Sequence, residues 1–281
     1  MPLPYPLNPL GISVREELPL TLTAVEASTV QLTATGSPTV SGLHYRLGTS
    51  GPWLPYTIGT VIPLAAGKKV QFWNSATTLS RSNNLVQFVM DGKISGSGNM
   101  QSMLNYSDIC PNYCFWALFS FCSALIRPPD LTAKVINDAC YGDMFRGTKI
   151  VHSPKVFAQN SDFNSCLSTF RDCLDLVDIP NFRFSVFAGR FLRGAFQGCI
   201  SLRSVKLAAS IVEDRGLELA FDGCSALSNI EVDFTTWGTF GTEFLNWVRG
   251  VSTTGTFVKP AALPEEYGPS RIPTGWTVIN K

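Results

Sequence analysis

In the first third of the chain, apolar and polar positions alternate with a period of two. Short runs such as PLTLTAVE, STVQLTATG and KKVQFWN carry this alternation between about residues 18 and 88. Glycines separate the runs, at Gly36, Gly42, Gly48, Gly51, Gly59 and Gly67. Period-two alternation interrupted by turn residues is typical of half-buried strands. Six or seven such strands in about 75 residues predict a small immunoglobulin-like β-sandwich, which we place at residues 17–92.

The second half of the chain repeats itself. Five segments align: FSFCSAL from Phe119, FRGTKIV from Phe145, FRDCLDL from Phe170, FQGCISL from Phe196 and FDGCSAL from Phe221. The phenylalanines recur at a nearly constant step of about 25 residues, which lies in the range of solenoid repeats. A degenerate copy, WVRGVST, begins one further step along the chain, at Trp247. A second apolar register precedes each phenylalanine, at Cys114, Cys140, Cys166, Phe191 and Leu217.

A repeat of this length has a direct structural meaning. One unit of about 25 residues supplies one strand and one return segment, and it leaves an apolar edge exposed unless a neighbouring unit stacks on it. Stacking aligns phenylalanine with phenylalanine and cysteine with cysteine along one axis. The sequence therefore predicts a mixed, mainly β chain in which a solenoid of about five to six units fills residues 110–258.

The remaining segments connect or close these two parts. Residues 1–16 hold Pro2, Pro4, Pro6 and Pro9, which fix an extended path without backbone donors and predict a docking arm. Residues 93–109 contain KISGSGNMQ, whose glycines and serines predict a linker and repeat cap. Residues 259–281 are expected to form a C-terminal tail or cap.

The repeats resemble the BspA-like branch of the leucine-rich-repeat family, whose units read roughly F-x-x-C-x-x-L followed by a short strand. The sandwich, the junction and the tail are similar to a layout found in proteins of gut anaerobes and their phages. The second copy departs from the pattern with Thr148 and Val151, and Pro128 and Pro129 interrupt the strand after the first copy, which predicts that this copy is a cap. Family members of known role are mostly surface adhesins or phage tail proteins, so the resemblance implies binding.

Composition narrows the possible partners. Lys and Arg total 22 against 21 for Asp and Glu, with no basic run, so we expect no nucleic-acid partner. A charged fraction of 15% with 19 phenylalanines suits subunit interfaces and predicts a homo-oligomer. The most apolar stretch, FWALFSFCSALI, is shorter than the roughly 18 residues needed to cross a bilayer, so no membrane insertion is expected.

Candidate chemistry is sparse. Seven of the eight cysteines fall at two repeat positions, which predicts buried ladders rather than zinc ligands, and Cys110 is also expected to be structural. His44 and His152 lack the partners of a metalloprotease motif, and no GxSxG or GxxxxGK sequence occurs. Asp172, Asp175 and Asp178 could suggest calcium but cross a turn-to-strand boundary. We therefore predict no catalytic residues, no cofactor and no metal.

A binding surface follows from the strand pattern. In L-x-x-I-x-L, the residues between the apolar positions point away from the core and form two columns along the solenoid. Proline occupies two of these positions, at Pro129 and Pro180, and the other residues are the candidate partner-binding residues. These are Arg127, Ser153, Lys155, Asp178, Ser204, Lys206, Asn229 and Glu231. Such columns suit an extended polymer or a protein edge, and Trp237 and Trp247 are expected to close the last repeat.

These inferences favour a non-enzymatic structural or binding protein. We expect a bacteriophage virion component, of a tail or fibre, assembled in the host cytoplasm because the N-terminal sequence lacks an export signal. The arm and sandwich would bind other virion proteins, and the repeat face would bind a host-surface glycan or protein. The alternatives are a bacterial cell-surface adhesin module and a polysaccharide-degrading enzyme.

Overall fold

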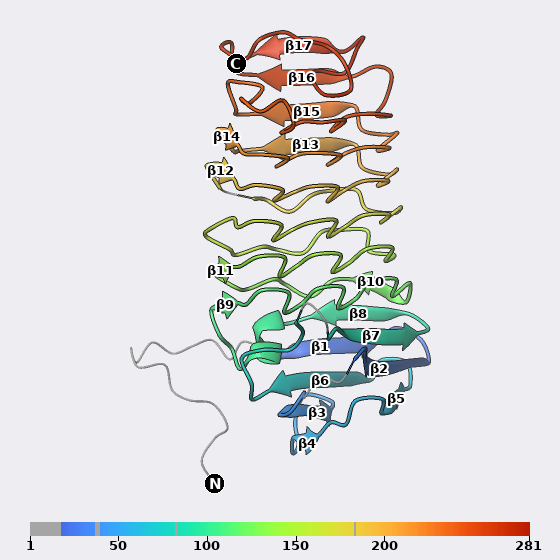
Figure 1. Ribbon diagram of the computed structural model, residues 1–281. Coiled ribbons are helices and arrows are strands. Elements are labelled where there is room, and N and C mark those ends of the chain that lie inside the picture. The colour runs from blue at the N-terminus through green and yellow to red at the C-terminus, as the bar shows by residue number, and fades with distance from the viewer. Residues whose placement is uncertain (1–17, 37–39, 82–83, 183) are drawn as a thin grey trace.

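The computed structural model describes residues 18–36, 40–81, 84–182 and 184–281. The chain is mainly β, with 29% strand and almost no helix, and it contains a β-solenoid of about seven turns. Figure 1 shows the N-terminal sheets at one end of the molecule and the coils stacked on them up to the C-terminus. The prediction of a mainly β chain with a stacked solenoid is confirmed, and the solenoid is longer than the five to six units expected. The predicted N-terminal arm lies outside the described residues.

Two sheets form the N-terminal end. The six-stranded sheet has the order β10-β8-β1-β6-β3-β4, and the three-stranded sheet has the order β5-β2-β7. The strands are β1 (Leu20–Ala24), β2 (Ser28–Ala34), β3 (Leu43–Leu47), β4 (Leu54–Pro55), β5 (Val61–Leu64), β6 (Lys69–Asn74), β7 (Val86–Asp91), β8 (Ile94–Ser97) and β10 (Leu125–Arg127).

The two sheets share one apolar core. Phe72 of β6 meets Phe88 of β7 edge to face, with ring centroids 5.4 Å apart, which is a favoured aromatic geometry. Leu32 of β2 donates its backbone N–H to the hydroxyl of Tyr56, which follows β4, at 2.8 Å. The alternating pattern between residues 18 and 88 therefore produces facing strands, and the immunoglobulin-like topology stays a prediction.

The segment expected to be a linker and repeat cap is built into this core. β8 pairs antiparallel with β1 and parallel with β10, and a 3-10 helix, η1 (Met100–Leu104), follows with its residues buried. Gly96 is needed because a Cβ there would lie 2.9 Å from the carbonyl oxygen of Arg127. The prediction of a linker is wrong at β8, since here glycine and serine allow close packing of β10 rather than flexibility.

The solenoid has a parallel strand face. It carries β13 (Ser204–Leu207), β15 (Asn229–Val232), β16 (Thr256–Lys259) and β17 (Thr277–Asn280). Val205, Ile230, Phe257 and Val278 lie in register across these strands. Two pairs of short parallel strands lie on another side: β9 (Ile109–Cys110) with β11 (Val135–Ile136), and β12 (Val186–Phe187) with β14 (Ile211–Val212). Residues 259–281 add the last coil rather than a simple tail.

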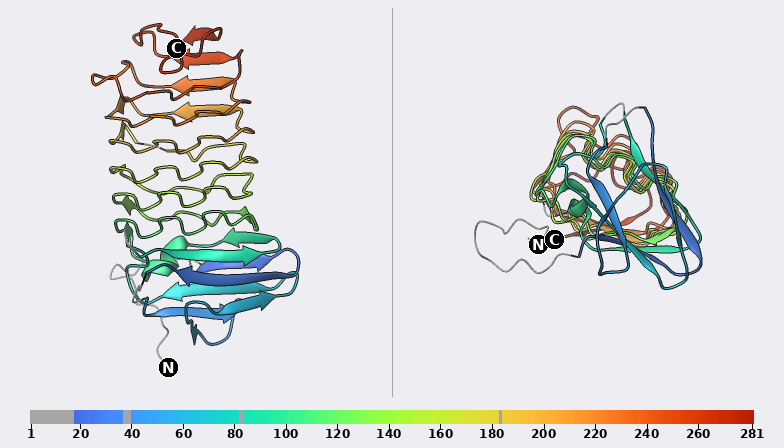
Figure 2. Two further views of the ribbon diagram at one scale, coloured as in Figure 1. Left: turned by 45° about the vertical axis from the view of Figure 1, so that its right-hand side comes forward. Right: turned by 90° about the horizontal axis from the view of Figure 1, so that it is seen from below.

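The return segments of the coils are chains of tight turns. The amides of Phe115 and Phe119 donate to the carbonyls of Cys140 and Met144 in the next coil, whereas the Leu118 amide donates back to Phe115 in its own coil. Within these turn segments, every fourth residue has a left-handed backbone conformation with positive φ. Glycine holds the last of these positions in four coils, at Gly147, Gly198, Gly223 and Gly250. Alternating local and inter-coil bonds satisfy the backbone without extended strands. Seen from below, the coils nearly superimpose (Figure 2).

The repeated phenylalanines form a continuous stack. Successive rings from Phe119 through Phe145, Phe170 and Phe196 to Phe221 lie 5.3–5.6 Å apart, and adjacent rings are inclined by at most 13°. Phe119 also stacks on Phe88 of β7 at 4.9 Å. The predicted ladder is therefore confirmed, and it joins the solenoid to the N-terminal sheets through one core.

The cysteines three residues after the phenylalanines form a second ladder. The thiols of Cys173, Cys199 and Cys224 donate to the carbonyls of Phe145, Phe170 and Phe196 in the preceding coils, at 3.0–3.1 Å. Thr148 takes the cysteine position in one coil and donates its hydroxyl to Phe145 of its own coil at 2.8 Å. Threonine is tolerated because its hydroxyl also finds a backbone acceptor, although in its own coil rather than in the preceding one.

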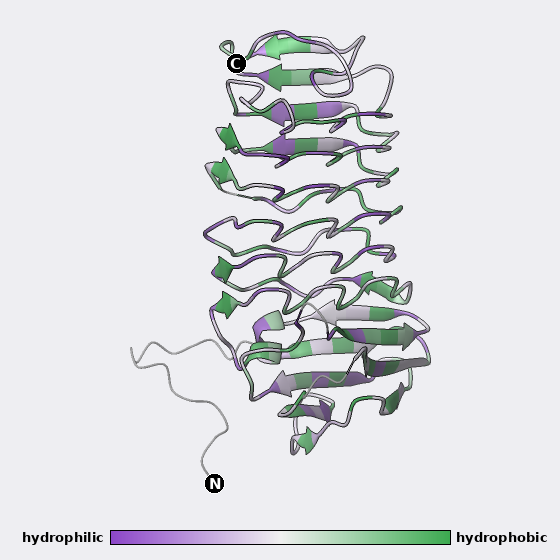
Figure 3. Ribbon diagram, in the orientation of Figure 1, coloured by the Kyte–Doolittle hydropathy of each residue, from purple (hydrophilic) through white to green (hydrophobic). Residues whose placement is uncertain are grey.

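Within the described part of the chain, no helix is long and apolar enough to cross a membrane. Figure 3 shows hydrophobic and hydrophilic residues interspersed along every coil. Each coil therefore supplies apolar residues to the shared core, and some large apolar side chains, such as Phe121 and Phe240, remain exposed.

Truncating one ring of the stack should destabilise the whole solenoid. Phe170 is buried between two parallel rings, so we expect Phe170→Ala to lower the free energy of unfolding by about 3–5 kcal/mol. Urea denaturation measures this change. Phe157→Ala, at an exposed phenylalanine, is the matched control and should cost less than about 1 kcal/mol. Equal costs for the two variants would contradict the importance of the stack.

The buried thiols should make the fold sensitive to alkali. Burial raises the pKa of Cys122 and of Cys224 from 9.0 to about 12, and that of Cys173 to about 11. Above pH 9 the unfolded thiols lose protons that the folded ones keep, so stability is fully present below pH 9 and falls between about pH 9 and 12.

Each thiol contributes about 1.4 kcal/mol per pH unit to this fall. Denaturant unfolding at pH 8, 9 and 10 measures it. A variant with Cys122→Ala, Cys173→Ala and Cys224→Ala should be less stable at pH 8 but should show a shallower pH dependence. An unchanged slope would mean that these thiols do not cause the alkaline loss.

Candidate functional site

Half of the predicted partner-binding residues lie on two adjacent strands. Ser204 is opposite Asn229, and Lys206 is opposite Glu231, in the parallel pair β13–β15. These side chains point outward, because the residues between them, such as Val205, are buried. We call the outward surface of β13, β15, β16 and β17 the strand face.

The charges on the strand face are largely paired with one another. Glu231 Oε1 lies 2.9 Å from Lys206 Nζ and 2.8 Å from Lys281 Nζ, and Lys281 Nζ lies 2.5 Å from a carboxylate oxygen of Asp233. Hydrogen bonds from the two lysines hold the pKa of the Glu231 carboxyl below its usual value. The sequence prediction missed Lys281, whose place on the face depends on the last coil.

The other four predicted residues lie on earlier coils, away from β13 and β15. Asp178 accepts the backbone N–H of Ser153 and contacts His152 Nδ1, both at 2.7 Å. Although burial opposes it, these hydrogen bonds lower the pKa of Asp178. Lys155 is exposed, and Arg127 lies exposed on β10 beside Ser95 of β8. The structure therefore brings six of the eight residues together in three adjacent pairs rather than in one pocket, and Arg127 and Lys155 belong to none of these pairs.

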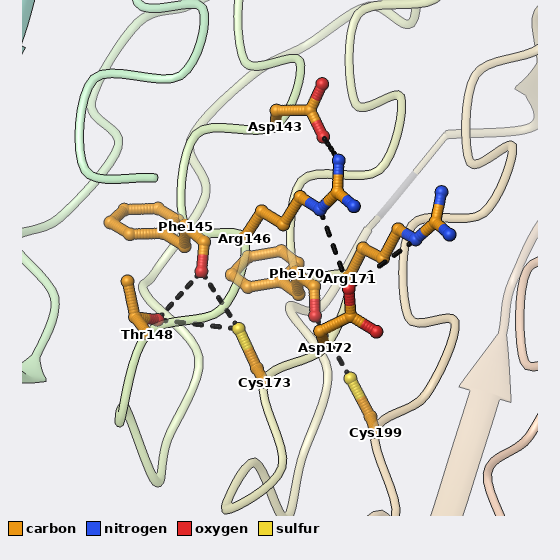
Figure 4. Close-up of polar contacts among 9 residues, drawn as sticks. All are labelled: Asp143, Phe145, Arg146, Thr148, Phe170, Arg171, Asp172, Cys173 and Cys199. Atoms are coloured by element: carbon orange, nitrogen blue, oxygen red, sulfur yellow. Dashed lines mark hydrogen bonds and ion pairs between the residues drawn. The ribbon is translucent and has the colours of Figure 1, made fainter. Parts of the chain in front are cut away.

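A separate network of charges covers the turn segments. Figure 4 shows Arg146 between Asp143 and Asp172, at 3.6 and 3.5 Å, with Arg171 also 3.6 Å from Asp172. Burial raises the pKa of Asp143 despite the neighbouring arginines. The three aspartates spaced by three residues thus have different partners, because Asp175 pairs with Lys149 and Asp178 with His152.

The cysteines all lie in the core. Cys110, which is outside the repeat, has its Sγ 3.1 Å from Cys114 Sγ. Burial raises the pKa of both thiols and keeps them protonated. Among the described residues, no group of three or more His, Cys, Asp or Glu side chains is arranged to hold a metal ion.

The two C-terminal tryptophans close the phenylalanine stack, as expected. Trp247 is fully buried and meets Phe221 at 64° rather than parallel to it. Its indole N–H donates to the carbonyl of Arg271, and the indole N–H of Trp237 donates to the carbonyl of Pro264, each at 2.9 Å. These tryptophans anchor the last loop and are not available to stack on a ligand.

A groove that the sequence pattern does not predict lies at one corner of the solenoid. It lies along β14 and the turn segments beside it and has a volume of about 570 Å³. Its walls include Phe163, Ile211 and Phe240, all exposed, together with several carboxylates. We call it the corner groove. The repeat alignment gives no signal for it, because Phe163 and Phe240 are outside the ladder positions.

Charges on the strand face should contribute little to stability. Lys206→Glu places two carboxylates at paired positions, yet exposed ion pairs are worth about 0–1 kcal/mol, so we expect a small loss that shrinks in high salt. Urea denaturation at low and high ionic strength measures this loss. Combining Lys206→Glu with Glu231→Lys should recover most of it, and failure of this swap would show that the pair does not act through its charges.

Neither a protein-family model, nor a curated protein, nor a solved structure matches the chain.

Proposed function

We propose that this protein is a non-enzymatic attachment protein that presents the strand face of a rigid solenoid to a partner. The repeats resemble the BspA-like leucine-rich-repeat branch, whose members of known role are mostly surface adhesins or phage tail proteins, and of these two roles we propose that of a bacteriophage virion component of a tail or fibre. The partner of the strand face would be a host-surface glycan or a protein. The N-terminal sheets and arm would bind other virion proteins, and several copies would assemble together.

The continuous phenylalanine stack is the observation that carries this proposal. Rings from Phe88 of β7 to Phe221 pack on one another without interruption. A shared core transmits orientation from the N-terminal sheets to the far coils, so the strand face is held in a fixed position relative to the docking end. A rigid, preformed surface loses little conformational entropy on binding, and several copies multiply its affinity.

The strand face has the chemistry of a contact surface rather than of an active site. Its outward residues are serine, asparagine, threonine and paired charges, together with the apolar pair Val258 and Ile279, at the spacing of neighbouring strands. This mixture suits hydrogen bonding and apolar contact along an extended partner. Glycoside hydrolysis requires a carboxyl group whose pKa is raised to act as an acid. The pKa of Glu231 is held low instead, which favours binding over hydrolysis. A bacterial surface adhesin module would use the same face.

Binding to intact host-type bacteria tests the proposal. We expect the multivalently displayed protein to bind cells, and a variant with Ser204→Trp and Lys206→Glu, both on the strand face, to lose at least about 90% of the bound signal, as the loss of several surface contacts implies. Flow cytometry of labelled protein measures binding, and thermal denaturation checks that the variant is folded.

The matched control carries Lys68→Glu and Lys69→Glu, which change exposed lysines on the N-terminal sheets. It should bind cells as the unchanged protein does. If neither the unchanged protein nor the control binds cells, the receptor-binding role is refuted and a purely structural role inside a particle remains.

A further inference from the structure

The corner groove combines exposed apolar rings with negative charge. Phe163 is 41% and Phe240 is 73% exposed, and Ile211 of β14 is exposed between other lining residues. Exposed apolar side chains that line one groove are typical of a binding site, whereas isolated exposed apolar residues are common on any protein surface. The groove lies beside β12 and β14, along the edge of the coils where these strands are labelled in Figure 1.

The polar part of the wall is acidic. The described residues that line the groove include neither lysine nor arginine, and they include four carboxylates: Asp162, Glu213, Asp214 and Glu243. One oxygen of Asp162 accepts the backbone N–H of Phe163 at 2.7 Å, and one oxygen of Glu213 accepts that of Gly189 at 3.1 Å. These bonds fix the orientation of the carboxylates, and each leaves a second oxygen for another donor.

Glu243 is the most constrained of the four. It is 1% exposed, and its Oε1 accepts the backbone N–H groups of Thr239 and Phe240 at 2.7 and 2.8 Å. Its Oε2 is buried and has no hydrogen-bond partner among the described residues. Although burial opposes it, hydrogen bonds from the backbone lower the pKa of this carboxyl. The chain's own backbone N–H groups therefore stabilise the charged form of Glu243, so its carboxylate adds a buried negative charge to the wall of the groove.

Two cations of the chain itself flank the groove. The guanidinium of Arg190 lies over the ring of Phe163, 5.2 Å from its centroid, and Arg215 Nε lies 3.9 Å from Asp214. Neither arginine belongs to the residues that line the groove. They offset part of its charge and leave the interior acidic.

A bare metal ion fits this site poorly. Calcium and magnesium need several oxygens converging on one point, and no such cluster exists among the described residues. Exposed aromatic rings next to carboxylates instead suit a large, weakly hydrated cation, which is attracted to the ring face as well as to the negative charge.

We propose that the corner groove binds an organic cation, an alkylammonium or guanidinium group, held against the ring of Phe240 and by the carboxylate of Glu213, with the buried negative charge of Glu243 adding to the attraction. This site goes beyond the proposed function, because it lies on a different side of the solenoid from the strand face. The same chemistry is carried by a basic peptide side chain and by a choline headgroup.

Two pairs of probes test the proposal with the full chain. Nα-acetyl-arginine amide is compared with Nα-acetyl-citrulline amide, and choline with 3,3-dimethylbutan-1-ol, which has the same shape without the charge. Isothermal titration or ligand-detected NMR at low salt should show that at least one of the two cations binds. Its neutral analogue should bind at least about tenfold more weakly than the cation. The better of the two cations identifies the source that the groove fits.

Variants locate the site. Phe240→Ala should weaken binding of the cation about threefold to thirtyfold, the range expected for loss of a cation–π contact, and Glu213→Gln should weaken it while keeping an acceptor for the Gly189 N–H. Phe157→Ala and Glu26→Gln change an exposed phenylalanine and an exposed glutamate outside the groove. These control variants should bind as the unchanged protein does.

Any one of three results would overturn the proposal. The first is that neither cation binds, and the second is that the neutral analogues bind as tightly as the cations. The third is that Phe240→Ala and Glu213→Gln both leave the affinity for the cation unchanged. Loss of cell binding by the strand-face variant is independent of these outcomes, so failure at one site does not imply failure at the other.

Discussion

The structure depends on the close stacking of one coil on the next. In the turn segments, alternate amides bond within a coil and to the neighbouring coil, so a coil completes its hydrogen bonds only when the next one lies in register. The phenylalanine stack and the cysteine thiols that donate to phenylalanine carbonyls impose the same register from inside. The single core, the rigid strand face and the corner groove all follow from this one constraint.

The repeat itself could be predicted because its physical cause is periodic. A nearly constant step between phenylalanines must place equivalent residues in line, and Phe145 and Phe170 do stack. The chains of tight turns could not be predicted, because alanine, arginine, serine and aspartate hold left-handed positions there as well as glycine. Those conformations are imposed by neighbouring coils rather than by local propensity.

The candidate sites also contain features that the sequence predicts and features that it does not. Outward positions of the strands could be assigned from the pattern, and Lys206 and Glu231 lie where expected. Their pairing with Lys281 could not be foreseen, since it depends on a final coil without a recognisable repeat. The corner groove was invisible because Phe163, Glu213 and Phe240 are far apart in the sequence and meet through the offset of successive coils. β8 was misread because its glycine and serine are typical of linkers.

The stack of rings also gives the molecule a mechanical direction. It begins on Phe88 inside the N-terminal sheets, where both faces of the first coil are covered, and it ends on Trp247, which is turned across the stack. Between these two rings, each of Phe145, Phe170 and Phe196 has a nearly parallel ring on both sides. A force along the solenoid axis is therefore carried through the core from one coil to the next, so the coils should respond to load as one stiff column rather than as separate springs.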